Sequence, residues 1–357
     1  MIVGSTKEIT PEKRISITPE TTKSLKRLGL NILLEKGYGE SLGFTDNDYK
    51  DNGAEIIIEK KDIFNKSNLI CKVNFPSNED LSHIKDKTHL IVSNIDTNTK
   101  NEFSKKINIF ALNLLPRITR AQSMDVLSSQ ANLAGYRAVI ESVYEYQKAV
   151  PMMMTAAGTV PAAKVLVVGA GVAGLQAIAT AKRLGAIVSA TDVRMSAKEQ
   201  VESLGGKFLT VDGVQDMETK GGYAKEMTEE FKRKQSEIIK QAVSKSDIII
   251  CTALIPGKPA PRIISETMVE SMKPGSVVFD LAVKQGGNSA YSEIDKTIDK
   301  NGVKIIGIDN LMNKLPLTAS NLYSKNIFSF IRNLFSREKN QFIINMEDEI
   351  IKKTLIK

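Results

Sequence analysis

The sequence predicts an α/β protein of two domains, each built around a parallel β-sheet. Short apolar runs alternate with amphipathic helical stretches along most of the chain, a pattern typical of parallel strands connected by helices. At 357 residues the chain is also long for a single hydrophobic core. Its hydrophobic content of 42% is ample for two globular cores.

The first domain is predicted from six apolar runs, which we expect to form strands. They lie at residues 2–3, 31–34, 54–58, 68–73, 89–93 and 108–112. Amphipathic patterns between them predict helices at residues 20–28, 47–52, 62–66 and 98–106. The polar loops 8–14 and 72–77 lie where strands end, and such loops line the ligand crevice of an open α/β sheet.

Residues 115–150 combine a polar segment with a long helical pattern. The pattern runs from about residue 130 to 148, and Ser128 and Ser129 are candidates for its start, so we expect a helix that links the two domains. The residues ahead of it are rich in polar groups: Arg117, Arg120, Gln122, Asp125, Ser128, Ser129 and Gln130. This density favours a functional role over the alternative of a solvated linker.

The second domain opens with a βαβ unit over residues 164–194. Its turn has the G-x-G-x-x-G pattern of dinucleotide-binding proteins, Gly169-Ala170-Gly171-Val172-Ala173-Gly174. Gly169 permits the tight turn, Gly171 lets the backbone approach a pyrophosphate, and Gly174 lets the helix pack closely on the strand. The N-terminus of that helix offers N–H groups and a partial positive charge to the pyrophosphate.

An acid and an arginine after the second strand of this unit bear on the choice of nucleotide. Asp192 has the spacing expected of the residue that binds the ribose hydroxyls of NAD(H), and its charge repels the 2′-phosphate of NADP(H). Arg194 is suited to such a phosphate, so NADP(H) is the alternative. The sequence favours NAD(H).

The rest of the chain completes the second domain and returns to the first. Strands are predicted at residues 207–211, 247–251, 276–279 and 304–308, and helices at 197–204 and 224–244. Thr252, Ala253 and Leu254 follow one strand, where a loop would edge the adenosine half of the nucleotide. The polar insertion 212–223, which ends at Tyr223, is interpreted as a mobile flap over the nucleotide, with a passive surface loop as the alternative. The amphipathic helix at 322–335 is expected to rejoin the first domain.

Composition argues against several classes of function. The net charge of +8 is spread along the chain without interleaved aromatic residues, so nucleic-acid binding is not expected. The N-terminal residues carry charges where a signal peptide needs an apolar core, and prolines and glycines break the nearly uncharged stretch 149–181, so no membrane span is expected. Cys71 and Cys251 are predicted to be buried free thiols, His83 and His89 to be surface residues, and no metal site is predicted.

Long stretches of the chain resemble the NAD(H)-binding component of proton-translocating nicotinamide nucleotide transhydrogenases. The longest near-verbatim stretches are 116–139 and 151–186. Shorter ones lie at residues 18–21, 35–37, 191–194, 198–208, 221–227, 252–261 and 285–288. The resemblance implies two Rossmann-like domains joined by long helices, one of residues 1–127 with 312–357 and one of residues 128–311. It places the nucleotide in the cleft between them.

The resemblance also implies a reaction and its partners. NADH bound here would pass hydride directly to NADP⁺ on a partner subunit, and a separate membrane subunit would translocate protons. Arg117, Asp125 and Ser128 would hold the nicotinamide carboxamide, and Gln122 would reach toward the partner's nucleotide. The other nucleotide-binding residues would be Gly169, Gly171, Val172, Ala173, Gly174, Asp192, Val193, Arg194, Tyr223, Thr252, Ala253 and Leu254. The family implies a homodimer, held on the cytoplasmic face of the inner membrane by partner subunits.

Two alternatives stay open. Alanine dehydrogenase belongs to the same superfamily, but it uses a histidine acid/base and an acid before the QGG turn, whereas this chain has no histidine in a matching motif and has Lys284 before that turn. Lys284 also departs from the usual transhydrogenase pattern. Arg14 and Lys72 match the positions that hold the keto acid in alanine dehydrogenase, so part of that pocket is retained. The other alternative is a nucleotide-binding subunit without catalysis.

Overall fold

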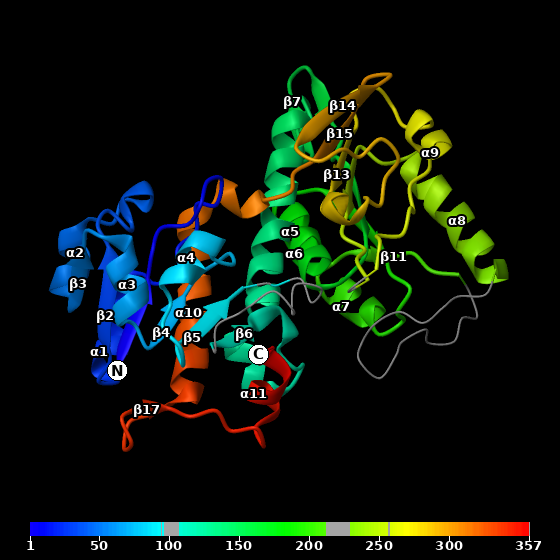
Figure 1. Ribbon diagram of the computed structural model, residues 1–357. Helices are drawn as coiled ribbons and strands as arrows, with labels where there is room; N and C mark the ends of the chain where they lie inside the picture. Colours follow the sequence, from blue (N-terminus) through cyan, green and yellow to red (C-terminus); the bar gives the residue numbers. More distant parts are fainter. Residues whose placement is uncertain (94, 96–106, 212–228, 256–257, 357) are drawn as a thin grey trace. The chain divides into compact units, whose positions relative to one another are not determined.

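The chain forms two compact units, of which the second is inserted into the first (Figure 1). The computed structural model describes residues 1–93, 95, 107–211, 229–255 and 258–356. One unit consists of Met1–Gln130 and Met312–Lys357, and the other of Ala131–Leu311. The domain limits expected from the sequence, after residues 127 and 311, stay a prediction.

The first unit contains a parallel sheet of six strands in the order β3-β2-β1-β4-β5-β6. The strands are β1 (Ile2–Ser5), β2 (Asn31–Glu35), β3 (Ala54–Ile57), β4 (Leu69–Cys71), β5 (His89–Val92) and β6 (Asn108–Ala111). All six predicted strands are confirmed. The chain order reverses between β1 and β4, as in doubly wound nucleotide-binding folds.

Short helices connect these strands. They are α1 (Pro19–Arg27), α2 (Asp46–Asp51), α3 (Lys60–Lys66) and α4 (Asn78–His83), with short 3-10 segments η1 (Glu40–Leu42), η3 (Leu112–Leu114) and η4 (Thr119–Met124). The sequence predicted α1, α2 and α3 but not α4, which is short and polar. The helix predicted at 98–106 lies outside the described residues.

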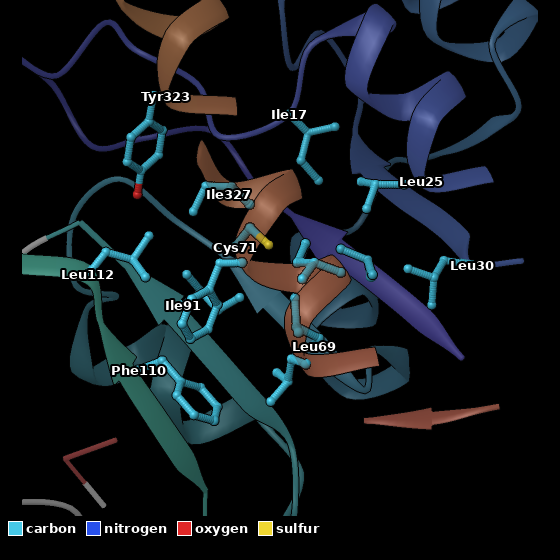
Figure 2. Close-up of a cluster of buried hydrophobic side chains, with 14 of the residues drawn as sticks. Ile17, Leu25, Leu30, Leu69, Cys71, Ile91, Phe110, Leu112, Tyr323 and Ile327 are labelled. Atoms are coloured by element: carbon cyan, nitrogen blue, oxygen red, sulfur yellow. The ribbon is translucent and has the colours of Figure 1, made fainter. Parts of the chain in front are cut away.

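The C-terminal segment completes the core of the first unit. It contains α10 (Pro316–Leu334), the two-stranded pair β16 (Phe335–Ser336) and β17 (Gln341–Phe342), and α11 (Glu349–Thr354). Figure 2 shows Tyr323 and Ile327 of α10 beside Cys71 and Ile91 of the sheet, and all four are fully buried. The predicted return of this helix to the first unit is confirmed.

The second unit contains a sheet of seven strands in the order β11-β10-β9-β12-β13-β15-β14. These are β9 (Lys164–Val168), β10 (Ile187–Thr191), β11 (Lys207–Phe208), β12 (Ile248–Cys251), β13 (Val277–Asp280), β14 (Lys296–Lys300) and β15 (Val303–Gly307). Strand β14 pairs antiparallel with β15, and its charged sequence suits a sheet edge. The strand predicted at 207–211 is shorter than expected, because only two of its residues pair.

The helices of the second unit include the long connection from the first. They are α5 (Val126–Glu145), α6 (Val172–Arg183), α7 (Ala197–Ser203), α8 (Glu229–Val243), α9 (Glu266–Glu270) and the short η5 (Val283–Gln285). An exposed hairpin, β7 (Met153–Thr155) with β8 (Gly158–Val160), was not predicted. No helix in the described ranges is long and apolar enough to cross a bilayer.

Candidate nucleotide-binding site

The order of strands in the second unit defines where a ligand fits. The chain order reverses between β9 and β12, and ligands of open α/β sheets bind beyond the carboxyl ends of the strands at such a point. Gly169 follows β9 and Thr252 follows β12. The Thr252 hydroxyl donates to the Gly169 carbonyl at 2.8 Å, so the two loops are joined at the reversal.

The glycine turn has the geometry that its sequence predicted. Gly169 has a φ of +94°, in the left-handed region that favours glycine. A methyl group at Gly174 would lie 1.9 Å from the Gly169 carbonyl oxygen, so this helix position needs glycine. A methyl group at Gly171 would meet nothing within 4 Å, which leaves room for a ligand to approach the backbone.

The N-terminus of α6 is suited to bind an anion. Its N-cap is Gly171, which brings no side chain to cap the first N–H groups of the helix. The long helix α5 packs against the same turn: a methyl group at Gly135 would lie 2.0 Å from the Ala173 carbonyl oxygen. No local pattern singled out Gly135, because its contact is with a distant segment.

Asp192 and Arg194 lie on the same side of the loop after β10, as the sequence predicted. Asp192 Oδ1 accepts from the backbone N–H and the Nε of Arg194, both at 2.9 Å, and Oδ2 accepts from Arg194 Nη2 at 3.0 Å. Oδ2 also accepts from the Ala170 N–H of the glycine turn at 2.7 Å. The carboxylate therefore ties the loop after β10 to the glycine turn and orients the guanidinium. Val193 lies between the two.

Two buried polar side chains that the sequence did not single out shape the loop after β12. The Asn288 amide is fully buried: its Oδ1 accepts from the Ala253 N–H at 2.9 Å, and its Nδ2 donates to the Ala253 carbonyl at 2.8 Å. Asp280, also fully buried, accepts from the Ser292 hydroxyl at 2.6 Å. Leu254 is 44% exposed at the end of this loop. A polar residue directly after the QGG turn was the available signal for Asn288.

Lys284, which departs from the pattern of the family, has an exposed side chain with a defined partner. Its ammonium group lies 3.2 Å from Asp309 Oδ2, beyond the end of β15. Both groups are at the carboxyl edge of the sheet. The lysine therefore brings positive charge to the same edge as the glycine turn.

The predicted polar segment lies in the first unit, as η4 and the start of α5. Asp125 separates the two, and its carboxylate accepts from the Ser128 N–H at 2.9 Å and from the Ser128 hydroxyl at 2.6 Å, as an N-cap residue does. This cap starts α5 at Val126, four residues before the predicted start. Gln122 and Arg117 have exposed side chains.

A cluster of buried charges occupies the reversal point of the first sheet, where β1 and β4 end. Lys72 lies 3.3 Å from Glu8, with both side chains 3% exposed, and it donates to the Lys7 carbonyl at 2.6 Å. Burial raises the pKa of the Glu8 carboxyl and lowers the pKa of the Lys72 ammonium. Arg14 pairs in the same way with Glu12, at 2.8 Å. The two cations expected to hold a keto acid are thus paired within the protein.

The histidines and cysteines have structural surroundings. His89 was predicted at the surface, and that prediction is wrong: its ring packs edge-on against Phe342 at 5.4 Å, and its Nδ1 contacts the Asn108 amide at 3.1 Å. His83 ends α4. Cys71 and Cys251 are buried free thiols, as predicted, and burial raises the pKa of each.

Two predictions remain, on the flap and on metals. Tyr223 and the rest of the predicted flap lie outside the described residues. Within the ranges that are described, no three histidine, cysteine or acidic side chains gather as metal ligands.

Comparisons with known proteins agree with this architecture over the whole chain. Residues 4–134 match the family "Alanine dehydrogenase/PNT, N-terminal domain", and residues 138–357 match "Alanine dehydrogenase/PNT, C-terminal domain". The first of the separately encoded parts of the NAD(P) transhydrogenase alpha subunit of Rhodospirillum rubrum is 48% identical, over 100% of this chain and 96% of that protein. The crystal structure of transhydrogenase from Sinorhizobium meliloti matches with a TM-score of 0.89 and 46% identity, over 99% of this chain and 98% of that one. An alanine dehydrogenase of Methanococcus maripaludis is more distant, at 28% identity over 96% of this chain and 90% of that protein.

Proposed function

The chain belongs to the alanine dehydrogenase/PNT family, and within it to the proteins that form the first part of the NAD(P) transhydrogenase alpha subunit, and from that premise we propose how it works. It binds NAD(H) at the carboxyl edge of its second sheet. There the bound dihydronicotinamide supplies a hydride, with its electron pair, to the nicotinamide of NADP⁺ on a partner subunit, which leaves NAD⁺ and NADPH. Hydride passes from carbon to carbon, so no side chain has to move a proton.

One observation carries this proposal: the glycine turn, the uncapped N-terminus of α6 and the Asp192 carboxylate share one edge of the sheet. The N–H groups of Val172, Ala173 and Gly174 bind the pyrophosphate, and the space beside Gly171 admits it. Asp192 accepts from the adenosine ribose hydroxyls and repels a 2′-phosphate. Thr252, Ala253 and Leu254 edge the adenosine half.

The polar segment of the first unit orients the reacting end of the nucleotide. Arg117, Asp125 and Ser128 hold the nicotinamide carboxamide, and the exposed side chain of Gln122 reaches toward the partner's nucleotide. Tyr223 closes over bound NAD(H). These residues work by fixing distance and excluding water, since direct transfer depends on near contact between two rings.

The chain works as one component of an assembly. A second subunit binds NADP(H), a membrane subunit translocates protons, and two copies of this chain form a homodimer on the cytoplasmic face of the membrane. Light scattering on the purified chain, with a mass of 39.2 kDa per copy, distinguishes a dimer from a monomer. A monomer at micromolar concentration would contradict the homodimer.

The decisive experiment mixes this chain with the NADP(H)-binding subunit of a transhydrogenase. We expect exchange of hydride between NADH and an NADP⁺ analogue, followed by absorbance, and no exchange without either protein. Replacing Gln122 by Ala should slow the exchange while NADH affinity stays nearly constant. Unchanged exchange in that variant would remove Gln122 from the site, and no exchange with the wild-type chain would contradict the proposed function.

The alternative is an amino acid oxidoreductase like alanine dehydrogenase. The paired state of Arg14 and Lys72 and the structural surroundings of His89 weigh against it. Rapid loss of NADH on addition of pyruvate and ammonia would favour it. A third possibility, a nucleotide-binding subunit without catalysis, predicts NADH binding without exchange in the mixed system.

A further inference from the structure

One face of α10 holds the polar segment that precedes α5, through contacts that recur every seven residues. Ala319, Asn326 and Asn333 are spaced by two helical turns and so lie on the same face. The Ala319 carbonyl accepts from Gln130 Nε2 at 3.2 Å, and Asn333 Oδ1 accepts from Arg120 Nη1 at 3.3 Å. Asn326 lies between these two contacts.

Asn326 uses both ends of its amide to bridge η4 and α5. Its Nδ2 donates to the Ser123 carbonyl at 2.9 Å, and its Oδ1 accepts from the Ser129 hydroxyl at 2.7 Å. The side chain is only 8% exposed, so it interacts with the protein rather than with a nucleotide. A buried amide is costly unless it is hydrogen-bonded, and these two bonds therefore fix the separation of Ser123 and Ser129.

The two anchor points enclose the residues proposed to act on the nicotinamide. Ser123 is adjacent to Gln122, and Ser129 is adjacent to Ser128. Between them Asp125 accepts from the Ser128 hydroxyl at 2.6 Å. A shift of either anchor would move all three of these side chains together.

We propose that Asn326 is a positioning residue for hydride transfer, and this inference rests on the proposed function. It holds the turn at Asp125 so that Gln122 keeps its place beside the reacting ring. Transfer between two rings is sensitive to distance, and a displacement of about 1 Å can cost up to about 100-fold in rate. The amide acts through the segment that it braces, so it should affect transfer more than nucleotide binding.

The test compares Asn326→Ala with Ser320→Ala in the mixed exchange assay. Ser320 is also buried on α10, where it donates to the Pro316 carbonyl and accepts from the Ile15 N–H; these bonds lie away from the polar segment. We expect Asn326→Ala to slow exchange about tenfold with NADH affinity within about twofold of wild type. Ser320→Ala should lower the melting temperature comparably and leave the exchange rate nearly unchanged. Where Asn326→Ala does not fold, Asn326→Ser, which can keep one of the two bonds, takes its place.

A second measurement separates this inference from the proposed function. Amide hydrogen exchange at residues 119–129 should be faster in Asn326→Ala than in the wild type and unaltered in Ser320→Ala, whether or not the chain transfers hydride. Equal exchange protection in both variants would overturn the bracing. Slower hydride exchange with an equal loss of NADH affinity would overturn the positioning role. Failure of the wild-type chain to transfer hydride, with the bracing intact, would count against the proposed function alone.

Discussion

Asp192 and Arg194 together set the selectivity for NAD(H) over NADP(H) at the level of single residues. The guanidinium that could bind a 2′-phosphate is held by the carboxylate that repels one. Replacing Asp192 by Ala removes the ribose acceptor and releases Arg194 from this pairing. We expect NADH affinity to fall by about 1–3 kcal/mol, the cost of leaving polar partners unpaired, and NADPH affinity to rise. Isothermal titration with both nucleotides measures the two changes.

Arg194→Ala is the matched control for that substitution. It keeps the Asp192 carboxylate and its bond to the Ala170 N–H, so NADH affinity should stay close to the wild-type value. If Asp192→Ala leaves NADH affinity unchanged, the carboxylate does not contact the ribose.

His89 should make the stability of the protein depend on pH. Burial lowers the pKa of its imidazole below the ordinary value of 6.5. Below pH 6.5 the unfolded chain therefore takes up a proton that the folded chain resists, so stability falls as the pH drops through that range. Urea unfolding of the wild type and of His89→Gln from about pH 5 to 7.5 measures this, and the variant should lose less stability on acidification. Parallel curves for the two proteins would contradict the assignment.

Single residues in this chain were predictable where their roles are local. The positive φ of Gly169 and the placement of Asp192 beside Arg194 follow from a few consecutive residues. His89 was misplaced because the ring that covers it, Phe342, comes from a distant part of the sequence. Asn326 could not be singled out for the same reason, since both of its partners are about 200 positions away.

At the scale of elements, the turn between β9 and α6 contains two glycines with opposite requirements. Gly171→Ala adds a methyl group to open space and should leave the free energy of unfolding within about 0.5 kcal/mol of the wild type. Gly174→Ala forces a methyl group against the Gly169 carbonyl oxygen and should destabilise by about 1–3 kcal/mol. NADH binding should be lost in Gly171→Ala despite its intact fold, because the methyl group occupies the approach of the pyrophosphate. Urea denaturation and titration of the same samples measure both effects, and normal NADH binding by Gly171→Ala would contradict the site.

The elements that the sequence predicted are those whose hydrophobic pattern is set by burial. Strands β9 and β12 are apolar runs because both faces of the sheet are covered. The hairpin β7–β8 escaped prediction because its residues are exposed and do not alternate. Strand β14 is charged and lies at the edge of its sheet, so it lacks the pattern of a buried strand. The early start of α5 depends on a cap, which hydrophobic periodicity does not reveal.

At the scale of the whole molecule, each unit has a sheet whose strand order reverses, but the residues at the two reversal points differ. In the second sheet that point has a glycine turn and an uncapped helix. In the first it contains the buried pair Glu8 and Lys72, and the Lys72 carbonyl accepts from Tyr323 of α10 at 2.8 Å. Equivalent topology therefore permits a site, and the residues at the reversal decide whether it binds a nucleotide.

The inserted arrangement of the two units gives the last prediction. The first unit needs α10, because Tyr323, Ile327 and Phe330 are buried in its core (Figure 2). A chain that ends at Leu311 should therefore leave the first unit unfolded. The second unit contains its own sheet and the whole glycine turn, so a fragment of residues 126–311 should unfold in one cooperative transition and still bind NADH.

Circular dichroism and titration of these two polypeptides check the prediction, with the intact chain as the control. Because residues 117–125 are absent from the 126–311 fragment, it should bind NADH more weakly than the intact chain while retaining its preference over NADPH, which depends on Asp192 and Arg194. A fragment that folds but binds neither nucleotide would mean that the first unit supplies most of the binding energy. That result would move the centre of the site away from the glycine turn.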